Sequence, residues 1–82
     1  MIELKNIDLS SVTNEEQSDK VIEELNELMT AIKTGTDDEV VEETLDTFQS
    51  LLGLILKRRN ITAYEVMESY PKHLEKLKFR PR

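Results

Sequence analysis

Four acidic residues near the middle of the sequence are spaced so that their carboxylates can meet in space. Glu24 and Glu27 stand three residues apart in the segment EELNEL, and Glu43 and Asp46 stand three residues apart in EETLD. On a helix, a spacing of three puts both side chains of a pair on one face, about one turn apart. Carboxylate oxygens suit hard cations, Mg²⁺ and Mn²⁺ before Zn²⁺. The spacing therefore raises the question of a divalent-cation site.

The two acidic pairs are also symmetric about Gly35. Glu27 and Glu43 each lie eight residues from it, and Glu24 and Asp46 each lie eleven residues from it. If Gly35 marks the turn of an antiparallel helical hairpin, Glu27 lies at the same level along the hairpin as Glu43, roughly 12 Å from the turn. Glu24 then lies at the same level as Asp46. Four carboxylates brought together in this way repel one another unless cations neutralise them.

Acidic residues are common in this chain, so the same pattern has a second interpretation. The chain carries 17 acidic against 11 basic residues, and other pairs such as Glu39 and Glu42 share the spacing of three. Those two have apolar residues opposite them across the turn. On a helical wheel Glu24 flanks the apolar stripe, whereas Glu27 and Asp46 point away from it. A solvated acidic face explains this without a metal, and both interpretations remain open.

Three segments of the form Thr-x-x-Glu, each followed by an apolar stripe, predict three helices. In such a capping box the hydroxyl accepts a backbone N–H bond, and the glutamate reaches back to the cap residue. The caps are Thr13, Thr36 and Thr62, and the predicted helices cover residues 14–33, 37–59 and 63–79.

The segments between and within these helices contain residues that end or bend a helix. Gly35 is expected to end the first helix in a left-handed conformation. Pro71 is expected to kink the third helix or to restart it as a short one. Residues 1–12 are expected to form a strand-like arm or to be disordered, and residues 1–82 to form a single domain.

The apolar pattern predicts an all-α fold. The first helix carries a stripe that includes Leu25 and Met29, the third turns Tyr70 inward, and the broad apolar face of the second, with Phe48, is typical of a central helix. The chain has 82 residues, no cysteine and 38% apolar residues, so its own core is thin, and such chains often gain stability by oligomerising. We expect an antiparallel helical hairpin plus a third helix, assembled into a helix bundle by homo-oligomerisation as a homodimer or tetramer.

Charge and hydropathy exclude several classes of protein. A net charge of −6 argues against a nucleic-acid partner, which needs a basic surface. The longest apolar run, LLGLIL, is too short to span a bilayer, and we expect no membrane partner. No signal peptide is visible, and the absence of cysteine fits a reducing compartment, so a cytoplasmic location is expected.

The segments EELNELMTAIKTG and EETLDTF resemble the MazG-like branch of the all-α nucleoside triphosphate pyrophosphohydrolases. The signature of that branch is E-E-x-x-E followed by E-x-x-D on the next helix, and the resemblance covers about residues 15–59. It implies Mg²⁺-dependent cleavage between the α and β phosphates of a nucleoside or deoxynucleoside triphosphate, giving the monophosphate and pyrophosphate.

The resemblance also implies roles for individual residues. It implies that Mg²⁺, with Mn²⁺ as a substitute, is held by four residues, and that Glu23 orients ligands or the attacking water. The implied metal ligands are Glu24, Glu27, Glu43 and Asp46, and the candidate phosphate-binding cations are Lys57, Lys72, Lys76 and Arg80.

A non-catalytic function is the alternative. The small size, the short segment ahead of the signature and the broad apolar second helix also fit a MazG-like dimerisation or interaction module, for example one encoded by a mobile element. Such a module has no need of a metal.

Overall fold

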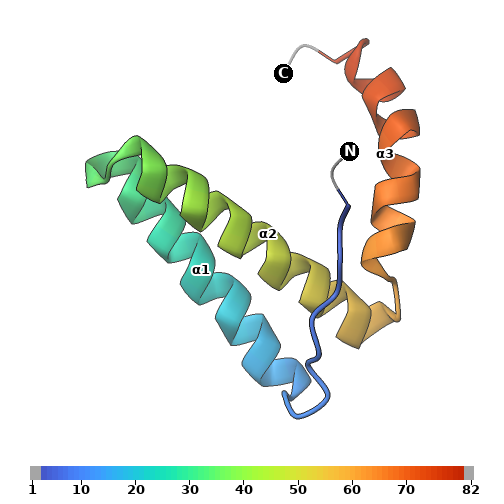
Figure 1. Cartoon of the computed structure of the whole chain (residues 1–82), viewed down its shortest axis with the longest axis horizontal. Coiled ribbons are helices and arrows are strands. Elements are labelled where there is room, and N and C mark those ends of the chain that lie inside the picture. Colours follow the sequence, from blue (N-terminus) through green and yellow to red (C-terminus); the bar gives the residue numbers. More distant parts are fainter. Residues whose placement is uncertain (1–2, 81–82) are drawn as a thin grey trace.

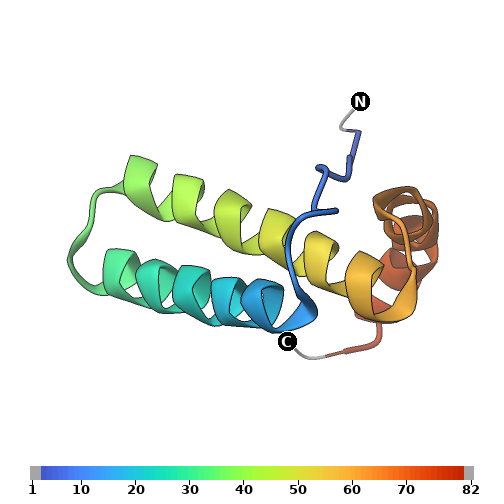
Figure 2. The same cartoon turned by 90° about the horizontal axis from the view of Figure 1, so that it is seen from below.

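The computed structural model describes residues 3–80, and within that range the chain forms three helices and no strand. The helices are α1 (Asn14–Thr34), α2 (Asp37–Arg59) and α3 (Ala63–Leu77). Helices α1 and α2 run antiparallel and side by side, and α3 leads away from the far end of α2 (Figures 1 and 2). The predicted all-α fold, a helical hairpin plus a third helix, is confirmed.

Each helix begins at a capping box. The Thr13 hydroxyl accepts a bond from the Glu16 backbone N–H at 3.0 Å, and the Glu16 carboxylate accepts one from the Thr13 N–H at 3.0 Å. The same reciprocal pattern is present at Thr36 and Thr62. Helix α2 ends at Asn60, whose φ of 56° is left-handed, whereas α3 continues through Pro71. At each helix start, side-chain oxygens of the capping box therefore accept hydrogen bonds from backbone N–H groups that have no partner within the helix.

Gly35 ends α1 in a way that the sequence did not predict. Its φ of −92° and ψ of 175° are extended, so the expected left-handed conformation was wrong. Its N–H donates to the carbonyl oxygen of Ala31 at 2.7 Å. A Cβ at this position would lie 2.9 Å from that oxygen, so close approach of backbone to backbone accounts for the glycine.

Two contacts between the helices fix the register of the hairpin. The Thr47 hydroxyl donates to the carbonyl oxygen of Glu24 at 3.2 Å. The Gln17 amide donates to the carbonyl oxygen of Ser50 at 2.9 Å, and a Cβ on Gly53 would lie 2.9 Å from the Gln17 amide nitrogen. Residues at similar distances from the turn thus face one another, as the symmetry of the sequence about the turn predicted.

Ahead of α1, residues 3–12 form an irregular arm that crosses α2 (Figure 1). Two side chains of α2 hold this arm through its backbone. The Gln49 amide donates to the carbonyl oxygen of Lys5 at 2.8 Å, and the Lys57 ammonium donates to the carbonyl oxygen of Leu9 at 3.1 Å. The arm is therefore docked on the hairpin.

Much of the apolar surface expected to form the core is exposed in the single chain. Tyr70 is 56% exposed and Phe48 is 40% exposed in the single chain, so the chain by itself does not provide the burial expected of both. The reason is that no element of the described chain covers these faces. The buried apolar residues are Ala31, Leu52 and Ala63, and the large exposed ones on the hairpin are Ile22, Leu25, Met29, Ile32, Val41, Leu45, Phe48 and Leu51. Within residues 3–80, no helix has the length and apolar character needed to cross a membrane.

Candidate metal centre

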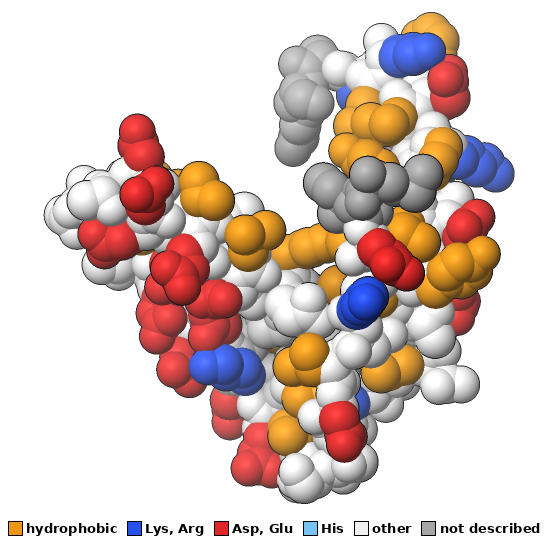
Figure 3. Space-filling view, viewed as in Figure 1, with side chains coloured by type: hydrophobic (Ala, Val, Ile, Leu, Met, Phe, Trp, Pro, Cys, Tyr) orange, Lys and Arg blue, Asp and Glu red, His pale blue; other side chains and the backbone are white. Residues whose placement is uncertain are grey.

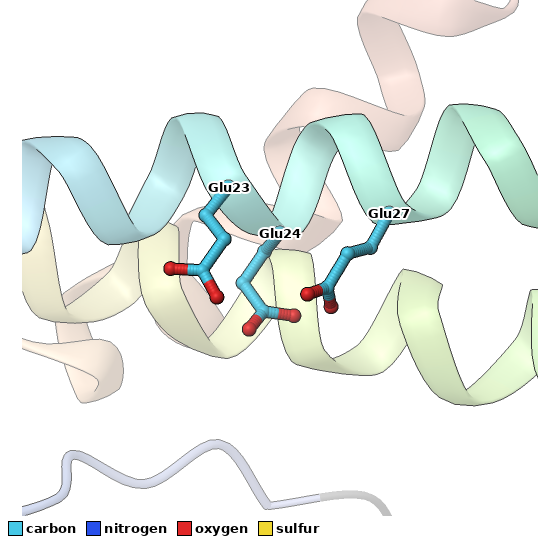
Figure 4. Close-up of side chains that lie close together, drawn as sticks. All are labelled: Glu23, Glu24 and Glu27. Carbon is cyan, nitrogen blue, oxygen red and sulfur yellow. The ribbon is translucent and has the colours of Figure 1, made fainter.

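The structure brings the predicted carboxylates together. On α1, ligand oxygens of Glu23, Glu24 and Glu27 lie within 4.8 Å of one another, and their carboxylates are directed toward α2 (Figure 4). Across the two helices, ligand oxygens of Glu24, Glu43 and Asp46 also lie within 4.8 Å of one another. Glu24 belongs to both groups, so the five acidic residues form one carboxylate cluster.

Two oxygen atoms of this cluster are buried without a hydrogen-bond partner in the described chain. One is Oε2 of Glu24, a residue only 6% exposed, and the other is Oε2 of Glu43. Burying a carboxylate oxygen without a partner costs several kcal/mol on the order-of-magnitude scale for polar groups. Hard divalent cations take such oxygen ligands. The donor set and its unpartnered atoms therefore fit a bound divalent cation.

The raised pKa of Glu43 also fits a site for a divalent cation. Partial burial raises the pKa of Glu43 above its ordinary value, and the charges of Glu27, Asp46 and Glu24 raise it further. The space-filling view shows acidic side chains gathered over α1 and α2 (Figure 3). Because a bound divalent cation would become the largest local charge, it would reverse this repulsion.

Lys20 is a member of this neighbourhood that the sequence analysis did not identify. Its Nζ lies 2.7 Å from Oε1 of Glu24 and 3.9 Å from Oε1 of Glu23, and the hydrogen bond to Glu24 raises the pKa of Lys20. The spacing of four between Lys20 and Glu24 on a helix is the signal that would have found it. This lysine neutralises part of the cluster.

The four candidate phosphate-binding cations are not brought to the cluster within one chain. Lys57 donates to the backbone of the arm from the last turn of α2, about 16 Å along the helix from Asp46. Lys72 and Lys76 are exposed on α3, and Arg80 follows that helix. Their role in phosphate binding remains a prediction.

A cavity of about 550 Å³ adjoins the carboxylate cluster. Glu24 and Asp46 line one part of it, and Ile7, Leu9 and Val12 of the arm line another. The sequence pattern does not predict this cavity, because the position of the arm depends on contacts between residues more than 40 positions apart in the sequence.

One known protein family matches most of this chain. A family model described as phosphoribosyl-ATP pyrophosphohydrolase matches residues 2–73. That family is part of the MazG-like superfamily of all-α nucleoside triphosphate pyrophosphohydrolases, so the superfamily that the sequence resembles is confirmed. The family is typically dependent on a divalent metal. Neither a curated protein nor a solved structure matches this chain.

Proposed function

Because the chain belongs to the phosphoribosyl-ATP pyrophosphohydrolase family, we propose that it is a Mg²⁺-dependent enzyme that cleaves a nucleoside triphosphate to the monophosphate and pyrophosphate. The observation that carries the proposal is the convergence of Glu24, Glu43 and Asp46, whose ligand oxygens lie within 4.8 Å of one another. The substrate class includes ribonucleoside and deoxyribonucleoside triphosphates, and phosphoribosyl-ATP, named by the family, is one member of it.

The reaction consumes one water molecule. The oxygen of that water forms a bond to the phosphorus of the α or the β phosphate, and the bond from the same phosphorus to the bridging oxygen breaks. The protons of the water end on the products or in solvent. Glu24, Glu27, Glu43 and Asp46 would hold the cation. When bound, Mg²⁺ neutralises phosphate oxygens and lowers the pKa of a coordinated water. Glu23, whose carboxylate is largely exposed, would orient ligands or the attacking water.

A second copy of the chain is the proposed partner of the exposed apolar surface. Leu25 and Met29 on α1 are about half exposed, and Leu45 on α2 is 61% exposed. An 82-residue chain without cysteine gains stability when such a surface is buried in an oligomer. The second copy could also bring the cations of its α3 to this chain's carboxylates, which gives Lys72 and Lys76 a role that a single chain does not.

A nucleotide panel tests the proposed reaction. The protein is incubated with ribonucleoside and deoxyribonucleoside triphosphates and phosphoribosyl-ATP, with Mg²⁺ or Mn²⁺, and monophosphate and pyrophosphate are quantified. We expect both products in equal amounts from the wild type and none above background from Glu43→Ala. Glu42→Gln is the matched control, because Glu42 is exposed on the same helix and outside the cluster. Wild-type rates equal to those of Glu43→Ala on every substrate would sink the proposal.

The extent of the exposed apolar surface supports one alternative, a non-catalytic interaction module. In that case Lys20 would provide the only charge compensation that Glu24 needs among the described residues. This alternative predicts that Glu24→Gln and Asp46→Asn leave the melting temperature unchanged or raise it. It also predicts that Mg²⁺ has no effect on melting, which separates it from the enzyme.

A further inference from the structure

We propose that Lys20 is an exchangeable counter-ion of the carboxylate cluster. Its ammonium pairs with Glu24 while the cluster holds no divalent cation, and it moves to a phosphate oxygen when the substrate arrives with its cation. This inference rests on the proposed function and adds to it how the charges of the site are exchanged. It also gives the site a phosphate-binding residue from the same chain, since the four cations predicted from the sequence are not brought to the cluster.

The contact between Lys20 and Glu24 occupies one oxygen of a buried carboxylate. Nζ of Lys20 lies 2.7 Å from Oε1 of Glu24, whose side chain is only 7% exposed, and 3.9 Å from Oε1 of Glu23. The other oxygen of Glu24, Oε2, is buried without a hydrogen-bond partner in the described chain, as is Oε2 of Glu43. One ammonium therefore leaves buried acceptors beside it that a more highly charged cation can use.

The ammonium and a divalent cation compete for the same carboxylates. Glu24 belongs to both groups of ligand oxygens in the cluster and is also the closest partner of Lys20. Figure 4 shows its carboxylate between those of Glu23 and Glu27. Like charges a few ångströms apart repel each other strongly when they are partly shielded from water. Lys20 is therefore expected to leave Glu24 when a divalent cation is held there.

The Lys20 side chain is free to make this move. It is 50% exposed, so the ammonium can leave Glu24 without displacing a buried side chain. A lysine carries its charge at the end of a flexible aliphatic stem. On a helix, a pair with the lysine four residues ahead of the glutamate is also weaker than the reverse order. The ion pair is therefore one that exchanges readily.

The cavity beside the cluster offers the ammonium a second partner. Lys20 lines this cavity of about 550 Å³ together with Glu24 and Asp46, and it is the only positively charged residue among the described residues that line it. Bare carboxylates repel a phosphate group, whereas the ammonium of a lysine binds one as a point charge. A phosphate group that enters the cavity with a cation thus meets Lys20 as its ammonium is released.

This exchange makes the binding of cation and phosphate depend on each other. Lys20 competes with a cation that arrives alone, because the released ammonium gains no new partner. When a phosphate group is present, the released ammonium binds it. Lys20 should therefore weaken the binding of a free cation and strengthen the binding of a cation with phosphate, which is a coupling between two ligands. A residue that only supports the fold would not act in opposite directions on the two.

Calorimetric titrations of the full chain with two probes test the exchange. The probes are Mg²⁺ alone and inorganic pyrophosphate in saturating Mg²⁺. For Lys20→Met we expect the Kd for Mg²⁺ alone to fall about fivefold and the Kd for pyrophosphate to rise about fivefold, as for loss of a partly exposed ion pair. Methionine keeps an unbranched side chain without the charge, and far-UV circular dichroism checks that α1 remains folded.

Two further variants isolate the charge of Lys20. Lys33→Met removes the same charge from an exposed position in the last turn of α1, outside the cavity. It should change both Kd values by less than about twofold, because solvent and salt screen a charge at that separation. Lys20→Arg keeps the positive charge and should not produce the opposite shifts.

The outcomes separate this inference from the proposed reaction. Shifts in the same direction, or a shift in only one Kd, would overturn the exchange, and hydrolysis by the wild type would leave the proposed reaction standing. Weaker binding of Mg²⁺ alone by Lys20→Met would likewise overturn it and show that Lys20 positions the Glu24 carboxylate. A wild type that binds neither probe would overturn it as well. If no triphosphate is hydrolysed, the proposed reaction fails, and opposite shifts would still support the exchange.

Discussion

The Thr47 hydroxyl on α2 lies 3.2 Å from the backbone carbonyl oxygen of Glu24 on α1 and 2.8 Å from that of Glu43 on its own helix. Thr47 is buried, so one shared donor connects the backbones of two residues in the carboxylate cluster. The carboxylates of these residues repel each other in the absence of a cation. The contact holds the helices together at the level where that repulsion acts.

Removal of this donor should weaken the hairpin. For Thr47→Val we expect the free energy of unfolding to fall by about 1 kcal/mol, because a buried hydrogen bond between the two helices is lost. Urea unfolding measures the change. Thr44→Val is the control, because the Thr44 hydroxyl is exposed and donates to Val40 in its own helix. Equal losses in the two variants would contradict a specific linking role for Thr47.

Glu43 should make stability depend on pH when no divalent cation is present. Its folded-state pKa is raised above the ordinary value of 4.5, so its contribution to stability is complete below pH 4.5 and is lost as the pH rises through the raised pKa. Glu43→Gln should therefore melt at a higher temperature than the wild type above this window. Thermal melts in chelator at several pH values test this, with Glu42→Gln as control. A gap between wild type and Glu43→Gln that persists below pH 4.5 would argue against the titration of this carboxylate.

Mg²⁺ should stabilise the wild type through the same carboxylates. A ligand that binds only the folded state adds about 2.7 kcal/mol at a concentration one hundred times its Kd, which raises the melting temperature by several degrees. Glu24→Gln should lose most of this response, because Glu24 contributes to both groups of ligand oxygens. Differential scanning calorimetry with and without Mg²⁺ measures it. A wild type that does not respond to Mg²⁺ would favour the interaction module.

The two glycines should respond differently to alanine. At Gly35 the new Cβ would lie 2.9 Å from a backbone oxygen of Ala31, which cannot rotate away, and we expect a loss of about 2 kcal/mol. At Gly53 the nearest atoms are the ends of the Leu9 and Gln17 side chains, which can move, and helix propensity favours alanine by about 1 kcal/mol. Chemical unfolding of both variants tests the order. A larger loss at Gly53 would show that the arm resists displacement.

The exposed apolar surface should keep copies of the chain together. Leu25→Asp should reduce the sedimentation coefficient from that of an oligomer toward that of a monomer, because it places a charge in the proposed interface. Asn26→Asp adds the same charge at an exposed polar position of α1 and should leave the assembly unchanged. A wild type that already sediments as a monomer at micromolar concentration would count against the self-partner.

Patterns among residues close in the sequence predicted the three helices and the position along the hairpin at which the carboxylates meet. Capping boxes depend on residues three positions apart, and the symmetry about Gly35 needs only a tight turn and a constant rise per residue. For this reason, the predicted hairpin register agrees with the contacts between Gln17, Ser50 and Gly53.

Long-range contacts accounted for what the sequence did not predict. The helical wheel places Glu24 at the edge of the apolar stripe but does not reveal that α2 covers it. The course of the arm depends on individual hydrogen bonds donated by Gln49, Lys57 and Ala63, which no periodic sequence pattern predicts. The apolar stripes that include Phe48 and Tyr70 indicate which helix faces are apolar enough to pack against another element. They do not indicate whether that element belongs to the same chain.

The short turn at Gly35 has a consequence for how the chain folds. All five carboxylates of the cluster, from Glu23 to Asp46, lie within twelve residues of Gly35 along the chain. Contacts between residues close in sequence close small loops and form early, whereas the arm and α3 must bring distant segments together. The hairpin can thus bring these carboxylates together before the arm docks.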